Sequence, residues 1–143
     1  HSFATRRSSD LVFSAHSLPE RILEINDPYK NQRRETRELV AQKAGIHNWT
    51  FAFQSAGRTN EKWFGPDLLT VMDKLHEAGE NKVLVCAVGF IADHLEVLYD
   101  IDIEAQDKAR KIGMHLERTQ SLNADPLLAK LFADLVIKNI HEK

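Results

Sequence analysis

The chain of 143 residues contains one cysteine, Cys86. A single thiol excludes an internal disulfide, and it excludes a zinc or iron–sulfur site built from several cysteines of this chain. Glycine is also scarce. The six glycines never approach the G-x-G-x-x-G or Walker spacing that cradles phosphates, so a nucleotide cofactor is not expected. Positive charge is not in excess either, because 19 Lys and Arg stand against 21 Asp and Glu, and we therefore expect no nucleic acid among the partners.

Long apolar runs are missing as well. No segment approaches the roughly 18 consecutive apolar residues of a membrane helix, and no secretory signal precedes the first apolar run. We therefore expect no integral membrane segment and a cytoplasmic location. What is present is ordinary for a folded protein, with 43% hydrophobic and 28% charged residues, and the length suits a single domain.

The first ten residues differ from the rest. The sequence HSFATRRSSD is polar and basic, shows no hydrophobic periodicity and directly precedes a run that reads as buried. We expect residues 1–10 to be a tail foreign to the domain and residues 11–143 to form the domain. The chain is then a part of a longer protein.

Four short apolar runs alternate with four segments of helical length. The runs are Leu11–Ala15, Trp49–Gln54, Lys82–Val88 and His115–Arg118. Helix start and stop signals follow each run: Asp27-Pro28 and Gly45, then Asp67 and Gly79, then Asp93 and Gly113, and finally Asp125-Pro126. Strands that alternate with helices indicate βαβ units. The pattern predicts an α/β fold, doubly wound, with a mainly parallel four-stranded sheet and helices on both faces.

In an open parallel sheet, ligands bind beyond the carboxyl ends of the strands. The segments expected there are Ser14–Pro19, Gln54–Gly57 and Val88–Glu96. Within the first of them, the imidazole of His16 offers a lone pair near neutral pH, so this residue can serve as a metal ligand or a base. The alternative is that His16 only hydrogen-bonds its own loop. No G-x-S-x-G sequence surrounds the neighbouring serines, which argues against a serine nucleophile.

Five acidic residues recur at spacings of three and four along the third helical segment. They are Asp93, Glu96, Asp100, Glu104 and Asp107. At 100° per residue this spacing puts all five on one face of a helix, and apolar residues flank them. Carboxylates beside apolar surface, together with one imidazole, suit a divalent first-row metal. The alternative is an ordinary solvated acidic face.

Two long motifs resemble the ferrochelatase family. The first is Phe13–Pro19 (FSAHSLP) followed by Asp27-Pro28-Tyr29, and the second is Val88–Asp100 (VGFIADHLEVLYD). Trp63–Pro66 and Glu117–Asn123 are similar to further family segments, so the likeness runs from about Val12 to Val136. Family members are roughly twice as long and fold as two similar α/β halves around a porphyrin cleft. The chain resembles the C-terminal half, and the N-terminal half is missing.

The resemblance implies a ferrochelatase, an enzyme that inserts Fe²⁺ into a porphyrin in haem biosynthesis. The porphyrin is coproporphyrin III or protoporphyrin IX, and the segment Gln54–Pro66 is more similar to the Gram-positive members that use coproporphyrin. Porphyrin and Fe²⁺ are substrates, and no tightly bound cofactor is implied. The Cys-rich extension that carries an iron–sulfur cluster in some members is absent from the sequence, so no cluster is expected.

The resemblance also implies roles for single residues. His16 and Glu96 would face each other across the centre of the macrocycle, as iron ligands and as acceptors of the pyrrole protons. Asp93 would orient or tune one of them, and Asp100 and Glu104 would continue a path for metal or protons. The porphyrin contacts would be Ser17, Leu18, Pro19 and Trp63, although Trp63 can equally pack under its own loop. The corresponding helix of the family is locally widened.

Two other functions stay open at this point. A related chelatase could load cobalt or nickel into a different tetrapyrrole, but such relatives generally use a pair of histidines, and here a histidine is paired with a glutamate. A non-catalytic α/β module that binds divalent metal without porphyrin is the third hypothesis. The preferred metal distinguishes a ferrochelatase from a cobalt or nickel chelatase. Binding of a tetrapyrrole distinguishes both enzymes from the metal-binding module.

Overall fold

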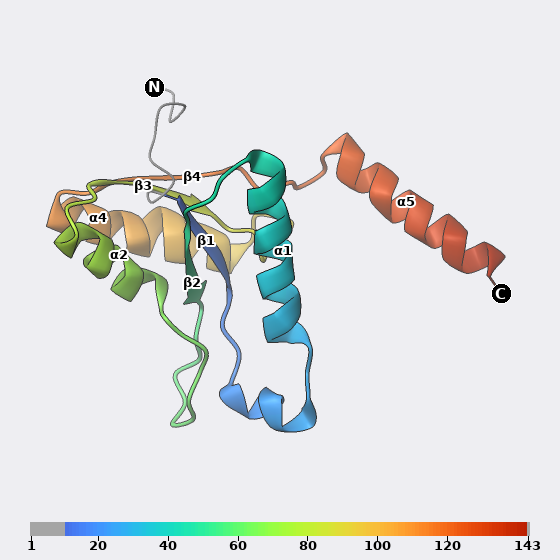
Figure 1. The fold of residues 1–143 in the computed structure, drawn as a ribbon, viewed down its shortest axis with the longest axis horizontal. Coiled ribbons are helices and arrows are strands. Elements are labelled where there is room, and N and C mark those ends of the chain that lie inside the picture. The colour runs from blue at the N-terminus through green and yellow to red at the C-terminus, as the bar shows by residue number, and fades with distance from the viewer. Residues whose placement is uncertain (1–10, 143) are drawn as a thin grey trace.

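The structure, a computed structural model, describes residues 11–142. Its centre is one sheet of four parallel strands in the order β2-β1-β3-β4 (Figure 1). The strands are β1 (Leu11–His16), β2 (Thr50–Gln54), β3 (Lys82–Cys86) and β4 (His115–Arg118). They coincide with the four expected apolar runs to within two residues at each end. The expected tail, residues 1–10, lies outside the described residues.

Strand β1 is flanked by β2 and β3 and is buried on both faces, which explains why five apolar or small residues precede its single histidine. Helix α1 (Tyr29–Ala44) covers the face that carries Leu11 and Phe13. Helix α2 (Leu68–Glu77) and a long helical segment cover the other face, which carries Val12. The expected doubly wound α/β fold with helices on both faces is therefore confirmed (Figure 1).

The long helical segment follows β3 and changes its winding twice. It begins as α3 (Leu95–Val97), widens into the π-helix η3 (Leu98–Ala105) and returns to α-helical winding in α4 (Gln106–Ile112). Its buried face consists of Val97, Ile101, Ala105 and Ala109, which pack on the sheet. The local widening that the family resemblance implied is present, and it contains Asp100 and Glu104 from the expected acidic stripe.

Local signals in the sequence set most helix ends. The side chains of Asp67 and Asp125 accept hydrogen bonds from the backbone N–H groups of Leu69 and Leu127, which caps α2 and the last helix. Gly45 and Gly113 end their helices with φ of 68° and 72°, a left-handed conformation that glycine adopts without strain. A 3₁₀ helix between β1 and α1, η2 (Glu20–Ile25), buries no side chain and was not predicted.

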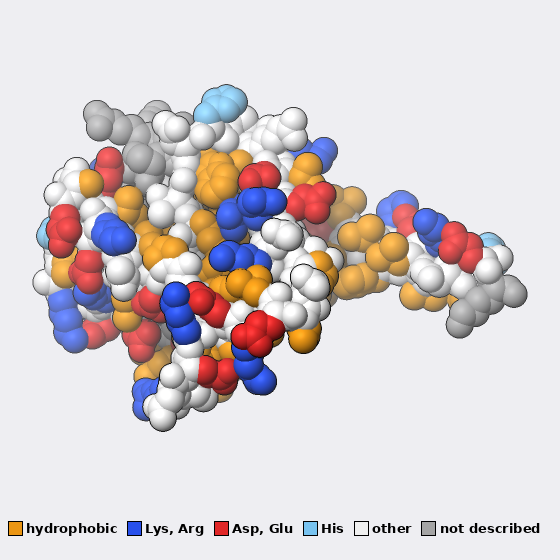
Figure 2. All heavy atoms as spheres, turned by 60° about the horizontal axis from the view of Figure 1, so that its bottom comes forward, with side chains coloured by type: hydrophobic (Ala, Val, Ile, Leu, Met, Phe, Trp, Pro, Cys, Tyr) orange, Lys and Arg blue, Asp and Glu red, His pale blue; other side chains and the backbone are white. Residues whose placement is uncertain are grey.

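Helix α5 (Pro126–His141) projects away from the sheet (Figure 1) and has no buried residue. Its exposed apolar side chains are Leu127, Leu131, Phe132, Leu135, Val136, Ile137 and Ile140, and they appear as the orange side chains of the projecting arm in Figure 2. The Asp125 cap and Pro126 start this helix without help from packing. The helix itself was predicted; its separation from the sheet was not, because helical signals are local and packing is not.

No helix among residues 11–142 combines the length and the apolarity needed to cross a bilayer.

The loop after β3 lies directly against β1. The backbone N–H of Gly89 donates to the carbonyl oxygen of Ser14 over 3.0 Å. A side-chain Cβ at position 89 would stand 2.5 Å from Cβ and 2.7 Å from Cα of Ala15, closer than non-bonded carbon atoms allow. Only glycine lets the loop approach this closely, and the loop leads into the helical segment that carries the acidic residues.

We expect Gly89→Ala to destabilise the fold, because the added methyl group must push the loop away from β1. Overpacking of this kind costs about 1–3 kcal/mol, to be measured as the free energy of unfolding in urea. Gly65→Ala is the matched control, since a Cβ there meets nothing closer than 3.7 Å, and its effect should stay within about 1 kcal/mol. Equal unfolding free energies for wild type and Gly89→Ala would contradict the steric argument.

Candidate functional site

His16 ends β1 at the carboxyl edge of the sheet, and Glu96 begins the helical segment after β3. Nε2 of His16 lies 3.2 Å from Oε1 of Glu96. Both side chains are partly open to solvent, with 29% of His16 and 46% of Glu96 exposed. The structure thus brings together the two residues that the sequence analysis selected as catalytic, from positions 80 residues apart in the chain.

The hydrogen-bond partners of His16 define its reactive atom. Nδ1 contacts the carbonyl oxygen of Ser17. Because a carbonyl oxygen only accepts, Nδ1 carries a hydrogen and Nε2 is the nitrogen that faces Glu96. A hydrogen bond between Nε2 and Glu96 needs one more proton. That proton is either on His16, which gives an imidazolium beside a carboxylate, or on Glu96, which gives a neutral imidazole beside a carboxylic acid. Without that proton, a lone pair of His16 Nε2 and one of Glu96 Oε1 point towards each other, and a cation between them would accept both.

Two further residues lie against His16. The hydroxyl of Tyr29 donates to the carbonyl oxygen of His16 over 2.7 Å, and partial burial raises the pKa of Tyr29 above its usual range, with Arg33 opposing this. The ring of Phe90 lies 6.4 Å from the His16 ring, centroid to centroid. Tyr29 therefore anchors the main chain of His16, and the ring of Phe90 flanks its imidazole.

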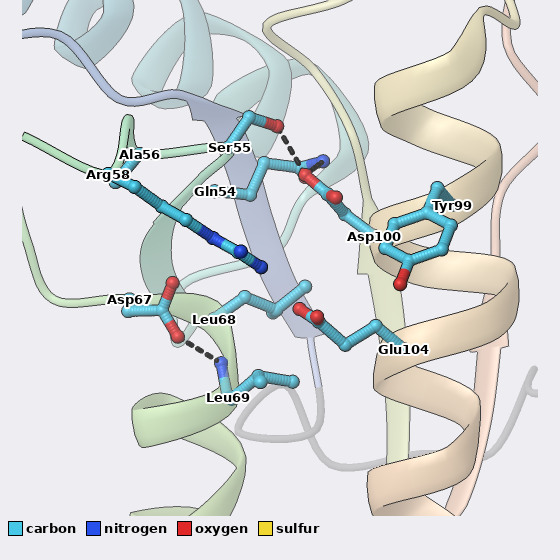
Figure 3. A pocket seen from close by; sticks show the side chains of 10 residues that line it. All are labelled: Gln54, Ser55, Ala56, Arg58, Asp67, Leu68, Leu69, Tyr99, Asp100 and Glu104. Atoms are coloured by element: carbon cyan, nitrogen blue, oxygen red, sulfur yellow. Dashed lines mark hydrogen bonds between the residues drawn. The ribbon is translucent and has the colours of Figure 1, made fainter.

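Asp100 and Glu104 line a cavity of about 290 Å³, and the amide of Gln54, which also lines it, lies 3.5 Å from the backbone carbonyl oxygen of Glu96. The side chains of Asp100 and Glu104 point from η3 towards the loop after β2, and Arg58 extends into the same space (Figure 3). Tyr99 and Asp67 also line it. The cavity therefore combines three carboxylates with one guanidinium, an excess of negative charge that attracts cations.

The position of Asp100 depends on the end of β2. The hydroxyl of Ser55 donates to the Asp100 carboxylate (Figure 3), and the Gln54 amide lies 3.5 Å from the same carboxylate oxygen. Ser14 in turn donates to the carbonyl oxygen of the Gln54 side chain over 2.8 Å. Ser55 reaches Asp100 from a φ of 61°, a conformation that non-glycine residues rarely adopt and that often marks functional sites.

The expected stripe of five acidic residues is only partly present. Asp93 precedes the helix and contacts Arg118 (3.1 Å) and Asn123 (3.1 Å) rather than His16 or Glu96. Ser121, Asn123 and Arg118 together hold its pKa below the usual range. Asp107 pairs with Lys111 over 2.6 Å, and this contact lowers its pKa. These two carboxylates face their own cations, which leaves Glu96 in contact with His16 and Asp100 and Glu104 in the cavity.

The four candidate porphyrin contacts do lie together. Backbone bonds join the loop after β1 to the loop before α2, from Phe64 N to Leu18 O (2.9 Å) and across a bridge between Pro19 and Trp63. Ser17, however, is 1% exposed and donates its hydroxyl to the carbonyl oxygen of Phe64. Its observed contact holds the two loops together and is not directed towards a ligand.

Trp63 packs on its own loop. Its indole N–H donates to the hydroxyl of Thr59 over 2.8 Å. Its ring lies so close to Gly57 that a Cβ there would stand 2.4 Å from a ring carbon. The structure therefore shows the packed arrangement, one of the two that the sequence left open, with the ring partly exposed.

Several residues at the site were not selected from the sequence: Tyr29, Gln54, Ser55, Arg58 and Phe90. Their side chains meet His16 or the acidic cavity only through the fold, and no spacing within one helix or strand links them. Two signals were available: Gln54, Ser55, Arg58 and Phe90 lie at or shortly after strand ends, which meet at the carboxyl edge of a parallel sheet, and Tyr29 and Phe90 lie within the family motifs.

Among residues 11–142, no three His, Cys, Asp or Glu side chains lie close enough together to enclose a metal ion. His16 and Glu96 supply one nitrogen and one oxygen donor. An ion held there would complete its coordination with ligands such as water, and two weak donors release an ion more readily than a closed cage.

Comparison with known proteins now decides the family. The model of the ferrochelatase family matches residues 1–140. The chain belongs to the ferrochelatase family. The matched range includes residues 1–10, so it lends no support to the expected foreign tail, which lies outside the described residues and stays a prediction.

Curated relatives agree with the family match. The ferrochelatase of Deinococcus radiodurans is 45% identical over 134 residues, and that of Thermus thermophilus is 50% identical over 125 residues. The coproporphyrin III ferrochelatase of Geobacillus sp. WCH70 is 44% identical over 136 residues. The alignments cover 92%, 87% and 94% of this chain but 42%, 39% and 44% of the relatives. The chain thus spans about two fifths of their length.

A solved structure shares the fold. The CbiX protein of Marinobacter aquaeolei VT8, whose name refers to cobalamin (vitamin B12) biosynthesis, superposes with a TM-score of 0.59 at 16% identity. The superposition covers 93% of this chain and 98% of that one. At this identity the likeness concerns the fold alone.

The ion pairs around Asp93 make a prediction about acid stability. Since the folded state lowers the pKa of Asp93 below 3.8, its ionised form stabilises the protein above that pH, and the contribution is lost as pH falls through the lowered value. Asp93→Asn should therefore be less stable than wild type near pH 7. The difference should shrink as the pH falls below about 4, measured by urea unfolding at each pH.

Asp134→Asn is the control for this prediction. Asp134 makes one exposed ion pair, with Lys130 on α5, and such pairs contribute less than about 1 kcal/mol. A difference between wild type and Asp93→Asn that stays constant from neutral to acidic pH would rule out the ionised contact as its cause.

Proposed function

We propose that the chain is the C-terminal half of a ferrochelatase, which inserts Fe²⁺ into a porphyrin in haem biosynthesis. The observation that carries the proposal is the contact between Nε2 of His16 and Oε1 of Glu96, within a chain of this family. The remaining half of the enzyme is then the partner of this chain. The absence of a tightly bound cofactor or iron–sulfur cluster and the cytoplasmic location stay predictions.

The reaction needs two bases. Fe²⁺ replaces the two N–H protons of the porphyrin, so one metal ion enters and two protons leave. Nε2 of His16 and the carboxylate of Glu96 can each accept one proton, because Nδ1 already carries its own hydrogen. The two atoms lie 3.2 Å apart, too close for a macrocycle between them. The half-exposed Glu96 side chain has room to turn away when a porphyrin enters.

Asp100 and Glu104 supply a route between solvent and this pair. They line the acidic cavity beside Glu96, and Ser55 orients Asp100. Carboxylate oxygens bind Fe²⁺ weakly enough to pass it on, and they can relay protons in the opposite direction. Asp93 has no part in this route, because Arg118 and Asn123 occupy its carboxylate.

For the porphyrin, the candidate contacts are Leu18 and Pro19, which follow His16 on the loop after β1, and the exposed part of Trp63, which is bridged to Pro19. Their two loops are joined by backbone hydrogen bonds, so their arrangement exists before a ligand arrives. Ser17 contributes by fixing these loops. Relatives such as that of Geobacillus sp. WCH70 carry the name coproporphyrin III ferrochelatase, and coproporphyrin III is therefore the expected substrate, with protoporphyrin IX as the competitor to be tested.

The deciding experiment joins this chain to the remaining part of the Deinococcus radiodurans ferrochelatase. Metalation of coproporphyrin III and protoporphyrin IX by Fe²⁺ is followed by absorbance. We expect His16→Ala to lower kcat/KM by about 100-fold or more, because a general base typically contributes at least that much. His47→Ala, an exposed histidine in the loop before β2, should leave the rate unchanged.

Three results would contradict the proposal or the role of His16 in it. Activity that survives His16→Ala would remove this residue from the chemistry. A folded fusion protein that binds Fe²⁺ but neither porphyrin would favour the non-catalytic metal-binding module, and insertion of Co²⁺ or Ni²⁺ in preference to Fe²⁺ would favour the related chelatases.

The acidic cavity makes a separate prediction for the same fusion protein. Asp100→Asn should raise the KM for Fe²⁺ about tenfold and change kcat much less, because it removes one charged ligand from the route. Asp107→Asn is the matched control, since Asp107 lies on the same helical segment but pairs with Lys111. Equal effects of the two substitutions would mean that general surface charge, and not the cavity, attracts the metal.

A further inference from the structure

A second cavity lies on the opposite face of the sheet, between α1 and the edge strand β2. Its volume is also about 290 Å³. The lining consists of Lys30, Asn31, Arg34, Arg37, Phe51, Phe53, Gly65 and Pro66. It shares no residue with the acidic cavity beside Glu96, and neither the proposed metal chemistry nor the candidate porphyrin surface uses it.

The charge of this cavity has one sign. Three cations line it and no carboxylate does. Of the three, Arg34 has an acidic neighbour, Glu38, at 3.9 Å. Within residues 11–142, Lys30 and Arg37 have no ion pair and instead lie over aromatic rings: Lys30 Nζ is 5.0 Å from the ring centre of Phe64, and the Arg37 guanidinium is 3.9 Å from that of Phe51.

Arg37 also has an unused hydrogen-bond donor. Its Nε is buried, and in the part of the chain that the structure describes it has no hydrogen-bond partner. A buried donor on a charged group is costly to leave without an acceptor. Burial lowers the pKa of Arg37 from its usual range, with Glu38 opposing and Arg34 reinforcing this. The group remains charged, so an anion would satisfy both the charge and the donor.

The walls of the cavity are fixed before any ligand arrives. The backbone N–H of Phe53 donates to the carbonyl oxygen of Pro66 over 2.8 Å, which attaches the Gly65-Pro66 wall to β2. The ring of Phe53 stacks on Phe64 and packs edge-to-face on Phe51, with centroids 5.5 Å and 4.9 Å apart. A preformed cavity with an aromatic floor and a few convergent polar groups is the usual form of a small-molecule site.

We propose that this cavity binds a small organic anion, with a carboxylate or phosphate group on Arg37, Arg34 and Lys30 and an apolar body against the aromatic lining formed by Phe51 and Phe53. Guanidinium groups match the geometry of both oxyanions through paired N–H donors. The aromatic floor adds contact area that a bare inorganic ion does not use. The proposal stands independently of the proposed function, because the two sites share no side chain.

Phenyl phosphate is the probe, titrated into the 143-residue chain by isothermal calorimetry. A ligand of this size should bind with a dissociation constant of roughly 1 mM. Inorganic phosphate should bind more weakly, and phenol should not bind. Benzoate, run alongside, distinguishes a carboxylate site from a phosphate site. In NMR spectra, the amides of Phe51, Phe53 and Gly65 should shift together.

Arg37→Gln should weaken phenyl phosphate binding at least tenfold, as expected for the loss of a charge-assisted pair. Lys43→Gln, on the same helix but outside the cavity, removes the same charge and should change nothing. If Arg37→Gln fails to fold, as judged by circular dichroism, Arg34→Gln and Lys30→Gln replace it, because both residues are exposed.

Three results would overturn the proposal. Wild type that binds neither phenyl phosphate nor benzoate would show that the cavity is not an anion site. An equal loss in Lys43→Gln and the cavity variants would assign binding to diffuse positive charge. If phenol binds as tightly as phenyl phosphate, the affinity comes from the aromatic lining and not from the cations.

Discussion

The close contact of Gly89 with β1 is the constraint on which the candidate site depends. Because no side chain separates the two backbones, Gly89 donates to Ser14 and the loop after β3 runs along the end of β1. The helical segment therefore begins within reach of His16. Glu96 stands on its first turn, where the side chain of His94 accepts from the Glu96 N–H. Widening of the loop would displace both Phe90 and Glu96, the two residues that face the His16 side chain from this segment.

Two cavities of similar volume lie on opposite faces of one sheet, and the side chains that line them carry net charges of opposite sign. Their difference comes from the elements that cover each face. The π-helical turns bring carboxylates to one side, and the first three turns of α1 bring Lys30, Arg34 and Arg37 to the other. The strands between them are the same, and β2 contributes to both: Gln54 to the acidic cavity, Phe51 and Phe53 to the basic one. Local helix composition, on a shared sheet, thus sets which ions each face attracts.

The fold and the pair His16–Glu96 were predictable from the sequence, because strand ends and caps are local signals and the family motifs are long. Three-dimensional partners were not. Asp93 reads as part of a stripe with Glu96, yet Arg118, 25 residues away, pairs with it. Ser17 reads as a ligand contact, yet it bonds to Phe64. No sequence motif marks the basic cavity. Its three cations lie on α1 at spacings that any solvent-exposed helix face would show. In each instance the deciding group comes from another element.

Helix α5 has a consequence for work with the isolated chain. Seven large apolar side chains stand 46% to 78% exposed along its sixteen residues. Exposed apolar surface of that extent favours self-association, and its strength grows with temperature and with sulfate or phosphate in the buffer. The colloidal behaviour of the chain is therefore set by a helix remote from both cavities, and dilution series will separate its contribution from that of ligand binding.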